Sequence, residues 1–158
     1  MAKRKKVSTK KIINDTRIIA ILRQNGRKRI ADISKETNIP LNEIHNFIRS
    51  NSYIKKHTAI VDFGKLGYNI KLVLALAVSS LQKDEIETYL GKSLHANFIY
   101  KINNGYDFMV ELIFKSMDES NRFIENLDRR FLIYDKKEYY ILETKKEQLF
   151  MTNHNLVF

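Results

Sequence analysis

Residues 15–60 read DTRIIAILRQNGRKRIADISKETNIPLNEIHNFIRSNSYIKKHTAI, and the architecture of the first half of the chain follows from this stretch. Apolar residues recur in it at spacings of three and four, which predicts three short amphipathic helices. The first is expected to begin at Asp15, whose carboxylate can cap the free amides of the first turn, and to end at an Asn-Gly pair. The second is expected over Arg29 to Thr37, and the third from Leu41 to about Ser50.

A three-residue turn joins the second and third of these helices. Asn38 suits the left-handed position that ends a helix, and Pro40 suits the first turn of the next one. The third helix is expected to bury Leu41, Ile44, Phe47 and Ile48. Its other face then carries the polar residues Asn42, Glu43, His45, Asn46 and Arg49. This arrangement is typical of a helix-turn-helix, although a three-helix bundle with a solvated polar face has the same pattern.

The distribution of charge favours the nucleic-acid interpretation. Residues 1–65 contain 16 Lys or Arg and 5 Asp or Glu, a net charge of +11. Residues 66–158 contain 12 and 13 of these, a net charge of −1. Because all the excess positive charge accompanies the predicted helices, the first half has the character of a phosphate-binding module attached to a neutral domain.

Composition limits the remaining possibilities. The chain has 158 residues, of which 44% are hydrophobic, so it can form one domain or two small ones. It has no run of about 18 apolar residues, no apolar segment after the basic start that would make a signal peptide, and no cysteine. A cytoplasmic protein without membrane association is the simplest expectation.

The ends of the first module are basic as well. Residues 1–11 are rich in Lys and Arg and are expected to be a flexible tail, which either follows DNA phosphates or only solubilises the chain. Tyr53 to Asp62 is expected to be extended and to form the wing of a winged helix-turn-helix. Gly64 and Gly67 interrupt both the helical and the strand pattern of apolar residues. We therefore place the domain boundary at about residue 65.

The second half predicts a β-α-β-β-α-β order, which is the ferredoxin-like arrangement of four antiparallel strands with two helices on one face. The hairpin turn is Asn103-Asn104-Gly105, and Asp118 is the expected cap of the second helix. The predicted strands are Lys71–Ser80, His95–Ile102, Tyr106–Lys115 and Lys136–Thr144, and the predicted helices are Asp84–Leu90 and Met117–Phe131. The other face of the sheet carries apolar side chains, so a second copy of the chain is expected to cover it.

Together the two halves resemble the Lrp/AsnC (feast/famine) transcription regulators. The resemblance covers about Asp15 to Phe150, including D-x-x-I-I-x-x-L-x-x-N-G-R at 15–27 and I-A-D-I-S at 30–34. In the second half of the chain, the resemblance includes Leu66-Gly67 and Gly105-Tyr106-Asp107. The family layout divides the chain into a tail (1–11), a winged helix-turn-helix (12–65), a ferredoxin-like dimerisation and effector domain (66–150) and a C-terminal tail (151–158). The resemblance implies a DNA-binding regulator that forms a dimer, tetramer or octamer and binds an amino-acid-like effector.

The candidate DNA-binding residues fall into three groups. A cluster before the second helix could hold a phosphate, although clustered cations are often only solubilising: Arg27, Lys28 and Arg29. The third helix has a single cation where relatives have several, so base contacts would come from Arg49 with Asn42, His45 and Asn46. The extended segment offers Lys55, Lys56 and His57 to the DNA backbone. In the second domain, Asn104, Tyr106 and Asp107 could line an effector site, or could simply form a turn, pack and cap.

Catalysis is not expected. The four histidines are scattered without metal-like spacing, and no phosphate loop or nucleophile motif is present, so no metal or cofactor is expected. Siroheme decarboxylases resemble the same two-domain family, but such an enzyme needs basic or histidine residues in its second half, and that half is nearly neutral. A low-specificity architectural DNA-binding protein is the other alternative, because a basic tail and a recognition helix with few cations would also suit that function.

Overall fold

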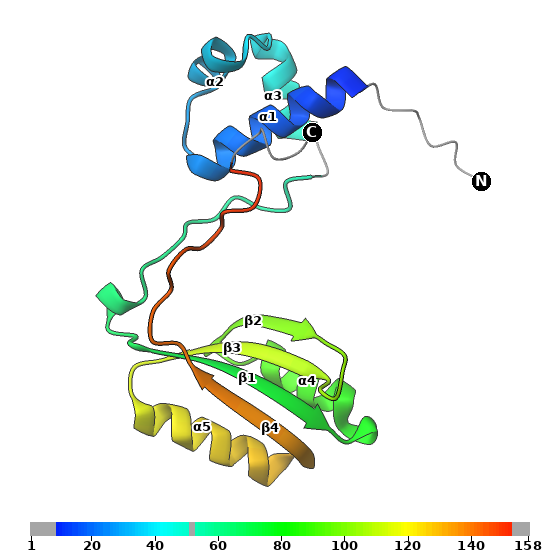
Figure 1. The fold of residues 1–158 in the computed structure, drawn as a ribbon, viewed down its shortest axis with the longest axis vertical. Helices are drawn as coiled ribbons and strands as arrows, with labels where there is room; N and C mark the ends of the chain where they lie inside the picture. Colours follow the sequence, from blue (N-terminus) through cyan, green and yellow to red (C-terminus); the bar gives the residue numbers. More distant parts are fainter. Residues whose placement is uncertain (1–8, 51–52, 153–158) are drawn as a thin grey trace, which may run out of the picture. The chain divides into compact units, whose positions relative to one another are not determined.

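The structure is a computed structural model that describes residues 9–50 and 53–152 (Figure 1). The chain forms two compact units, which are considered separately. The helical unit comprises residues 1–59 and 145–158, and the sheet unit comprises residues 60–144. Residues 145–150, which the family layout groups with the second domain, therefore belong to the helical unit. Among the described residues, no helix is long and apolar enough to cross a bilayer.

The helical unit contains the three predicted helices, but the first is longer than expected. The helices are α1 (Thr9–Gln24), α2 (Ile30–Thr37) and α3 (Leu41–Ser50). Because α1 begins at Thr9, residues 9–11 are helical rather than part of a tail, and Asp15 lies inside the helix, where it cannot cap its start. The Asp15 side chain is only 7% exposed, and desolvation raises its pKa. The remainder of the expected basic tail, residues 1–8, lies outside the described residues.

The turn between α2 and α3 has the predicted left-handed residue. Asn38 has φ 57°, and its N–H donates to the carbonyl oxygen of Ser34. The Ser34 hydroxyl donates in turn to the Ile39 carbonyl oxygen at 2.7 Å. Ile39 is buried, whereas Leu41, which was expected in the core, is 54% exposed. The core residue at this turn is therefore Ile39, and the small core of the unit consists of Ile18, Ile33, Ile39, Ile44 and Phe47.

Residues 54–62 form no helix or strand, so the expected wing is an extended segment without strand pairing within the described residues. Its beginning is anchored on α3: the rings of Phe47 and Tyr53 lie 6.4 Å apart, and Ile54 packs against the helical core. Beyond the segment, the chain near the predicted domain boundary forms a short 3-10 helix, η1 (Gly64–Leu66), which ends at Gly67 with φ 84°.

The sheet unit has the predicted β-α-β-β-α-β order (Figure 1). Its sheet is antiparallel with strand order β2-β3-β1-β4. The expected turn Asn103-Asn104-Gly105 is confirmed by positive φ at Asn104 and Gly105, but the last strand begins three residues earlier and ends four residues earlier than predicted. The elements are β1 (Ile70–Val78), η2 (Ser80–Gln82), α4 (Lys83–Gly91), β2 (Ala96–Lys101), β3 (Phe108–Phe114), α5 (Met117–Arg130) and β4 (Ile133–Tyr140).

Both helices of the sheet unit cover one face of the sheet. Leu72, Leu74 and Leu76 alternate along β1 and are fully buried in a core that side chains of α4 and α5 complete. The helix cap differs from the prediction: Ser116, not Asp118, caps α5, because its hydroxyl oxygen accepts the N–H of Glu119.

The opposite face, called the outer sheet face here, carries no helix of its own unit. Because paired residues of antiparallel strands share a face, the strand register identifies the side chains that lie on it. Val73 pairs with Glu111 and Tyr139, and Ala75 pairs with Met109 and Lys137. At its β2 edge, the rings of Phe98 and Tyr100 stack 6.0 Å apart. The centre of this face is therefore mostly apolar, with Glu111 as its charged residue, and aromatic and charged side chains lie toward the edges.

Candidate nucleic-acid interface

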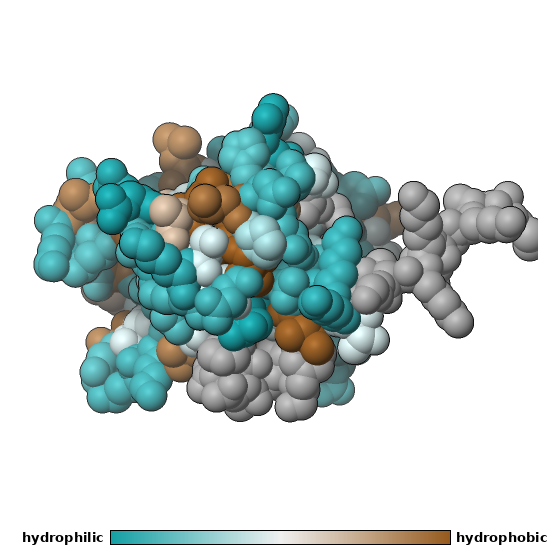
Figure 2. Space-filling model, turned by 90° about the horizontal axis from the view of Figure 1, so that it is seen from above, coloured by the Kyte–Doolittle hydropathy of each residue, from teal (hydrophilic) through white to brown (hydrophobic). Residues whose placement is uncertain are grey.

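The polar face of α3 is fully accessible. Ile44 and Phe47 anchor one side of the helix in the core, with exposed fractions of 0% and 6%. The helical period then directs the intervening residues away from the core. All four side chains predicted to read bases are exposed: Asn42, His45, Asn46 and Arg49. Figure 2 shows one face of the molecule, which hydrophilic side chains cover for the most part. The structure thus brings the predicted base-reading group together on one accessible helix face.

Arg49 and Glu43 differ in how they are held. Within the part of the chain that the structure describes, the Arg49 side chain forms no ion pair, so its guanidinium is available to an incoming ligand. Glu43 accepts a hydrogen bond from the Asn14 side chain at 3.0 Å, which ties it to α1. This contact favours a role of Glu43 on the helix surface over a contact with a base.

The basic cluster at residues 27–29 is partly neutralised. Lys28 pairs with Glu36, and the Arg29 guanidinium lies 2.9 Å from the Asp32 carboxylate. This hydrogen bond raises the pKa of Arg29 and lowers that of Asp32. The Arg27 side chain forms no ion pair with any described residue, and its backbone N–H donates to the Asn25 side chain. Arg27 is consequently the member of the cluster whose charge is most available to a phosphate.

Lys55, Lys56 and His57 are exposed on the extended segment that follows α3. The anchored residues Tyr53 and Ile54 fix the start of this segment beside α3. Its cations therefore begin within a few residues of the exposed helix face.

The three residues considered for an effector site make contacts within the sheet unit. Asn104 occupies the left-handed turn position with φ 67°. The Tyr106 hydroxyl donates to Asp135 at 2.5 Å, which raises the pKa of the phenol. The Asp107 carboxylate lies 2.5 Å from the Lys83 ammonium and accepts the Val78 N–H at 2.9 Å, and both contacts lower its pKa. Asn104 thus lies in a turn, whereas Asp107 binds the end of β1 and Lys83 rather than capping a helix. Asn104 is the most accessible of the three.

A contact that sequence reasoning missed joins the two ends of the chain. The Arg23 guanidinium donates to the carbonyl oxygens of Phe150 and Gln148 at 2.6 and 2.9 Å, and the Gln24 amide donates to that of Thr152. Arg23 also donates to the Gln148 side-chain oxygen at 3.2 Å. Most of these bonds go to backbone carbonyls, which every residue offers, so the side chains of residues 148–152 gave little indication of them. Among the described residues, no three His, Cys, Asp or Glu side chains gather to hold a metal.

Comparison with known proteins identifies relatives that match most of the chain in sequence. The chain is 32% identical to the HTH-type transcriptional regulator FL11 of Pyrococcus furiosus over 114 residues, which cover 70% of this chain and 76% of that protein. It is 29% identical to FL11 of Pyrococcus horikoshii over 136 residues, or 84% of this chain and 90% of that protein. No protein-family model matches the chain.

Solved structures have the same fold. LrpC of B. subtilis matches with a TM-score of 0.76 and 18% identity, covering 85% of this chain and 96% of that one. AsnC of E. coli matches with a TM-score of 0.73 and 17% identity, covering 84% and 93%. A transcriptional regulator of Neisseria meningitidis in complex with L-Met matches with a TM-score of 0.77 and 12% identity, covering 84% and 90%.

Proposed function

The chain belongs to the Lrp/AsnC family of DNA-binding helix-turn-helix transcription regulators, and from this we propose that the exposed face of α3 reads its DNA site. One observation carries the proposal: Asn42, His45, Asn46 and Arg49 share an accessible helix face, and the buried Ile44 and Phe47 fix its orientation. An α-helix fits the major groove, where each base pair presents a distinct pattern of donors and acceptors.

The side chains of this face match particular base edges. Asn can pair with adenine through two hydrogen bonds, and Arg can do the same with guanine. With two asparagines and one arginine, α3 is suited to sites in which A·T pairs predominate. Arg49 is the best candidate for a direct base contact because no described acid competes for its guanidinium.

Backbone contacts would come from the cations around α3. Arg27 lies just before α2, and Lys55, Lys56 and His57 follow α3. Lys28 and Arg29 would have to exchange Glu36 and Asp32 for phosphates, and since both pairs are at the surface, this exchange costs little. Each phosphate contact releases counterions, so affinity should fall steeply with salt.

A homodimer formed through two outer sheet faces would present two α3 helices to successive major grooves of a pseudo-palindromic site. The apolar centre of this face supports it, since such a surface is unfavourable in water. Assembly into tetramers or octamers would follow the family pattern. An amino-acid-like effector is also part of the proposal, because one protein of this fold is known in complex with L-Met. Asn104, Tyr106 and Asp107 are the candidate residues for its site.

The experiment compares Arg49→Ala with the parent chain on a selected binding site and on shuffled DNA, over a series of salt concentrations. We expect Arg49→Ala to weaken the selected site by about 1–3 kcal/mol and to change shuffled DNA much less. The matched control is Arg122→Ala, which removes an exposed cation from α5 in the sheet unit.

Two results would contradict the proposal. Equal losses on both DNAs would remove Arg49 from base reading. A parent chain that binds both DNAs equally, with the same steep salt dependence, would instead favour the architectural DNA-binding protein.

A further inference from the structure

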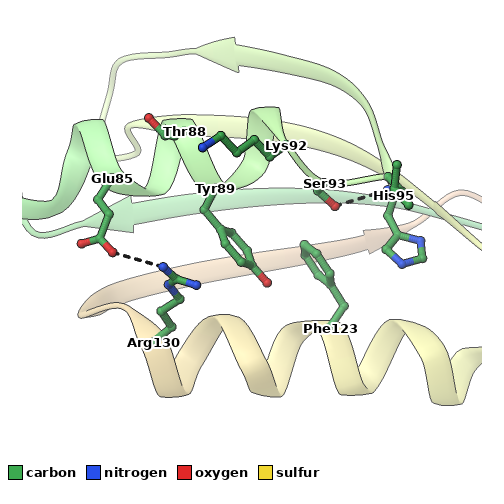
Figure 3. Close-up of a pocket in the computed structure, with 9 residues that line it drawn as sticks. Glu85, Thr88, Tyr89, Lys92, Ser93, His95, Phe123 and Arg130 are labelled. Carbon is green, nitrogen blue, oxygen red and sulfur yellow. Dashed lines mark hydrogen bonds and ion pairs between the residues drawn. The ribbon is translucent and has the colours of Figure 1, made fainter.

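A cavity of about 510 Å³ opens between α4 and α5 in the sheet unit (Figure 3). This size lies within the range of small-molecule sites. Its lining residues come from α4, from the loop before β2 and from α5, and none of them belongs to the 104–107 turn. The cavity is therefore separate from the residues proposed above for the effector.

One wall of the cavity is aromatic. Tyr89 of α4 and Phe123 of α5 point toward each other, with ring centroids 6.3 Å apart. His95 closes one end of the cavity, because its ring packs 5.9 Å from Phe123 and its Nδ1 lies 3.2 Å from the Ile113 carbonyl oxygen. Tyr89 is only partly buried, so part of this aromatic wall remains open to a ligand.

The other end of the cavity is charged. The Arg130 guanidinium stacks over the Tyr89 ring at 5.1 Å and lies 3.5 Å from the Glu85 carboxylate. The Arg130 and Glu85 side chains are 56% and 57% exposed, so their ion pair is weak and can exchange. Lys92 also lines the cavity, but Figure 3 shows its side chain running along α4 toward Thr88 rather than toward Arg130. Arg130 is therefore the cation that an added anion would meet at this end.

We infer that this cavity binds a small carboxylic acid with an aromatic group. The ligand carboxylate takes the place of Glu85 at the Arg130 guanidinium, with which it can form two parallel hydrogen bonds. The aromatic group packs on the exposed part of the Tyr89 ring, which the buried Phe123 ring supports from the core side. Stacking on Tyr89 holds the guanidinium in place, so little side-chain freedom is lost on binding.

The test is a titration of the full chain with phenylacetate, followed by amide NMR spectra. We expect saturable shifts at Tyr89, Phe123 and Arg130, with a dissociation constant on the order of 1 mM for a ligand of this size. Phenylacetamide, which lacks the charge, and acetate, which lacks the ring, should each bind at least about tenfold more weakly. Equal binding of either analogue, or shifts scattered away from the cavity, would overturn the inference.

Two variants act in opposite directions. Arg130→Gln should weaken phenylacetate binding roughly tenfold, because it removes the charged donor. Glu85→Gln should strengthen binding about two- to fivefold, because it removes the competing carboxylate. Arg129→Gln is the matched control, since Arg129 is the neighbouring cation on α5, pairs with Glu125 and does not line the cavity. An unchanged affinity in both Arg130→Gln and Glu85→Gln would contradict the site.

The site does not depend on the role of α3. The DNA affinity of each variant is therefore measured separately, in the absence of phenylacetate, and should equal that of the parent chain. Loss of phenylacetate binding with intact DNA binding tests the cavity alone, whereas the Arg49→Ala series tests the DNA interface alone.

Discussion

Asp107 shows how one residue of a family motif can hold a domain together. Its carboxylate joins the N–H of Val78, at the end of β1, to the ammonium of Lys83, at the start of α4. It therefore fixes the turn between these elements from a position next to β3. By stabilising this turn, Asp107 also positions the neighbouring Tyr106, whose hydroxyl donates a hydrogen bond to Asp135.

Asp107→Asn should destabilise the sheet unit by about 1.5 kcal/mol at neutral pH, because the amide cannot accept both charge-assisted bonds. The folded-state pKa of Asp107 is lowered, first by Lys83 and then by the Val78 N–H. Its contribution is thus present above the unfolded-state pKa and is lost as pH falls through the folded-state pKa. Thermal unfolding between pH 7 and pH 3 measures this: the difference between parent and variant should shrink toward the acid end.

The control for this prediction is Asp118→Asn, which alters an exposed carboxylate near the start of α5. A difference between parent and Asp107→Asn that stays constant over the whole pH range would show that the carboxylate charge contributes nothing.

Asn38 is the residue on which the helix-turn-helix turn depends. It adopts φ 57°, a conformation that places Cβ close to the backbone in most residues but that Asn and Gly tolerate. Asn38→Ala should therefore destabilise the helical unit by about 1 kcal/mol, whereas Asn38→Gly should be close to neutral. Urea unfolding monitored by circular dichroism at the helix wavelength measures both. Equal stabilities for the Ala and Gly variants would argue against the left-handed conformation.

At the level of elements, helix α1 makes two different kinds of contact. Ile18 anchors it to the core of the helical unit, and Arg23 and Gln24 near its end hold the segment at 148–152. The chain thus passes between its two units twice, at about residue 60 and again at about residue 145. The segment at 145–152 is consequently a part of the helical unit.

Arg23→Ala should release this segment, because the guanidinium is the donor for two of its carbonyl oxygens. Limited digestion with trypsin at the Lys145-Lys146 pair measures the release, since cleavage follows the population of the open form. We expect cleavage to be about five- to tenfold faster in the variant, which corresponds to the loss of about 1 kcal/mol of hydrogen bonding. Lys10→Ala, at the other end of α1, is the control and should be cleaved like the parent chain.

At the scale of the whole molecule, charge and apolar surface are separated. The first 65 residues carry the net charge of +11, and the sheet unit has a face with a mostly apolar centre that none of its own helices covers. The positive charge favours binding of DNA phosphates, and the apolar face favours association with another copy of the chain. Two copies joined through their outer sheet faces would double the cations available to one DNA site.

Met109→Arg tests this association, because Met109 lies on the outer sheet face between Ala75 and Tyr100. A charge there would lose its hydration in the dimer but keep it in the monomer, where Met109 is partly exposed. Sedimentation equilibrium should give a monomer for Met109→Arg and a dimer for the parent chain and for Met109→Leu. A parent chain that sediments as a monomer, or an Arg variant that remains dimeric, would exclude the outer sheet face as the interface.

The sequence alone determined the elements whose signals are local. The three- and four-residue periods predicted α2 and α3, and Asn38 and Gly105 marked turns that need positive φ. The exposed face of α3 also follows from its period, because a helix that buries Ile44 and Phe47 must expose the residues between them. These features depend on backbone sterics and on the spacing of apolar residues, and both can be recognised from residues that are close together in the sequence.

Only the tertiary structure decided the features that depend on distant partners. Asp15 is buried inside α1 because the helix extends back to Thr9, and Leu41 is exposed because Ile39 occupies the core at the turn. Ile133 joins β4 because β1 offers a pairing partner at Val78. The contact of Arg23 with residues 148–152 and the cavity between α4 and α5 each join segments that are remote in sequence. Their formation depends on the closure of long loops and on side-chain packing, neither of which leaves a periodic signal along the chain.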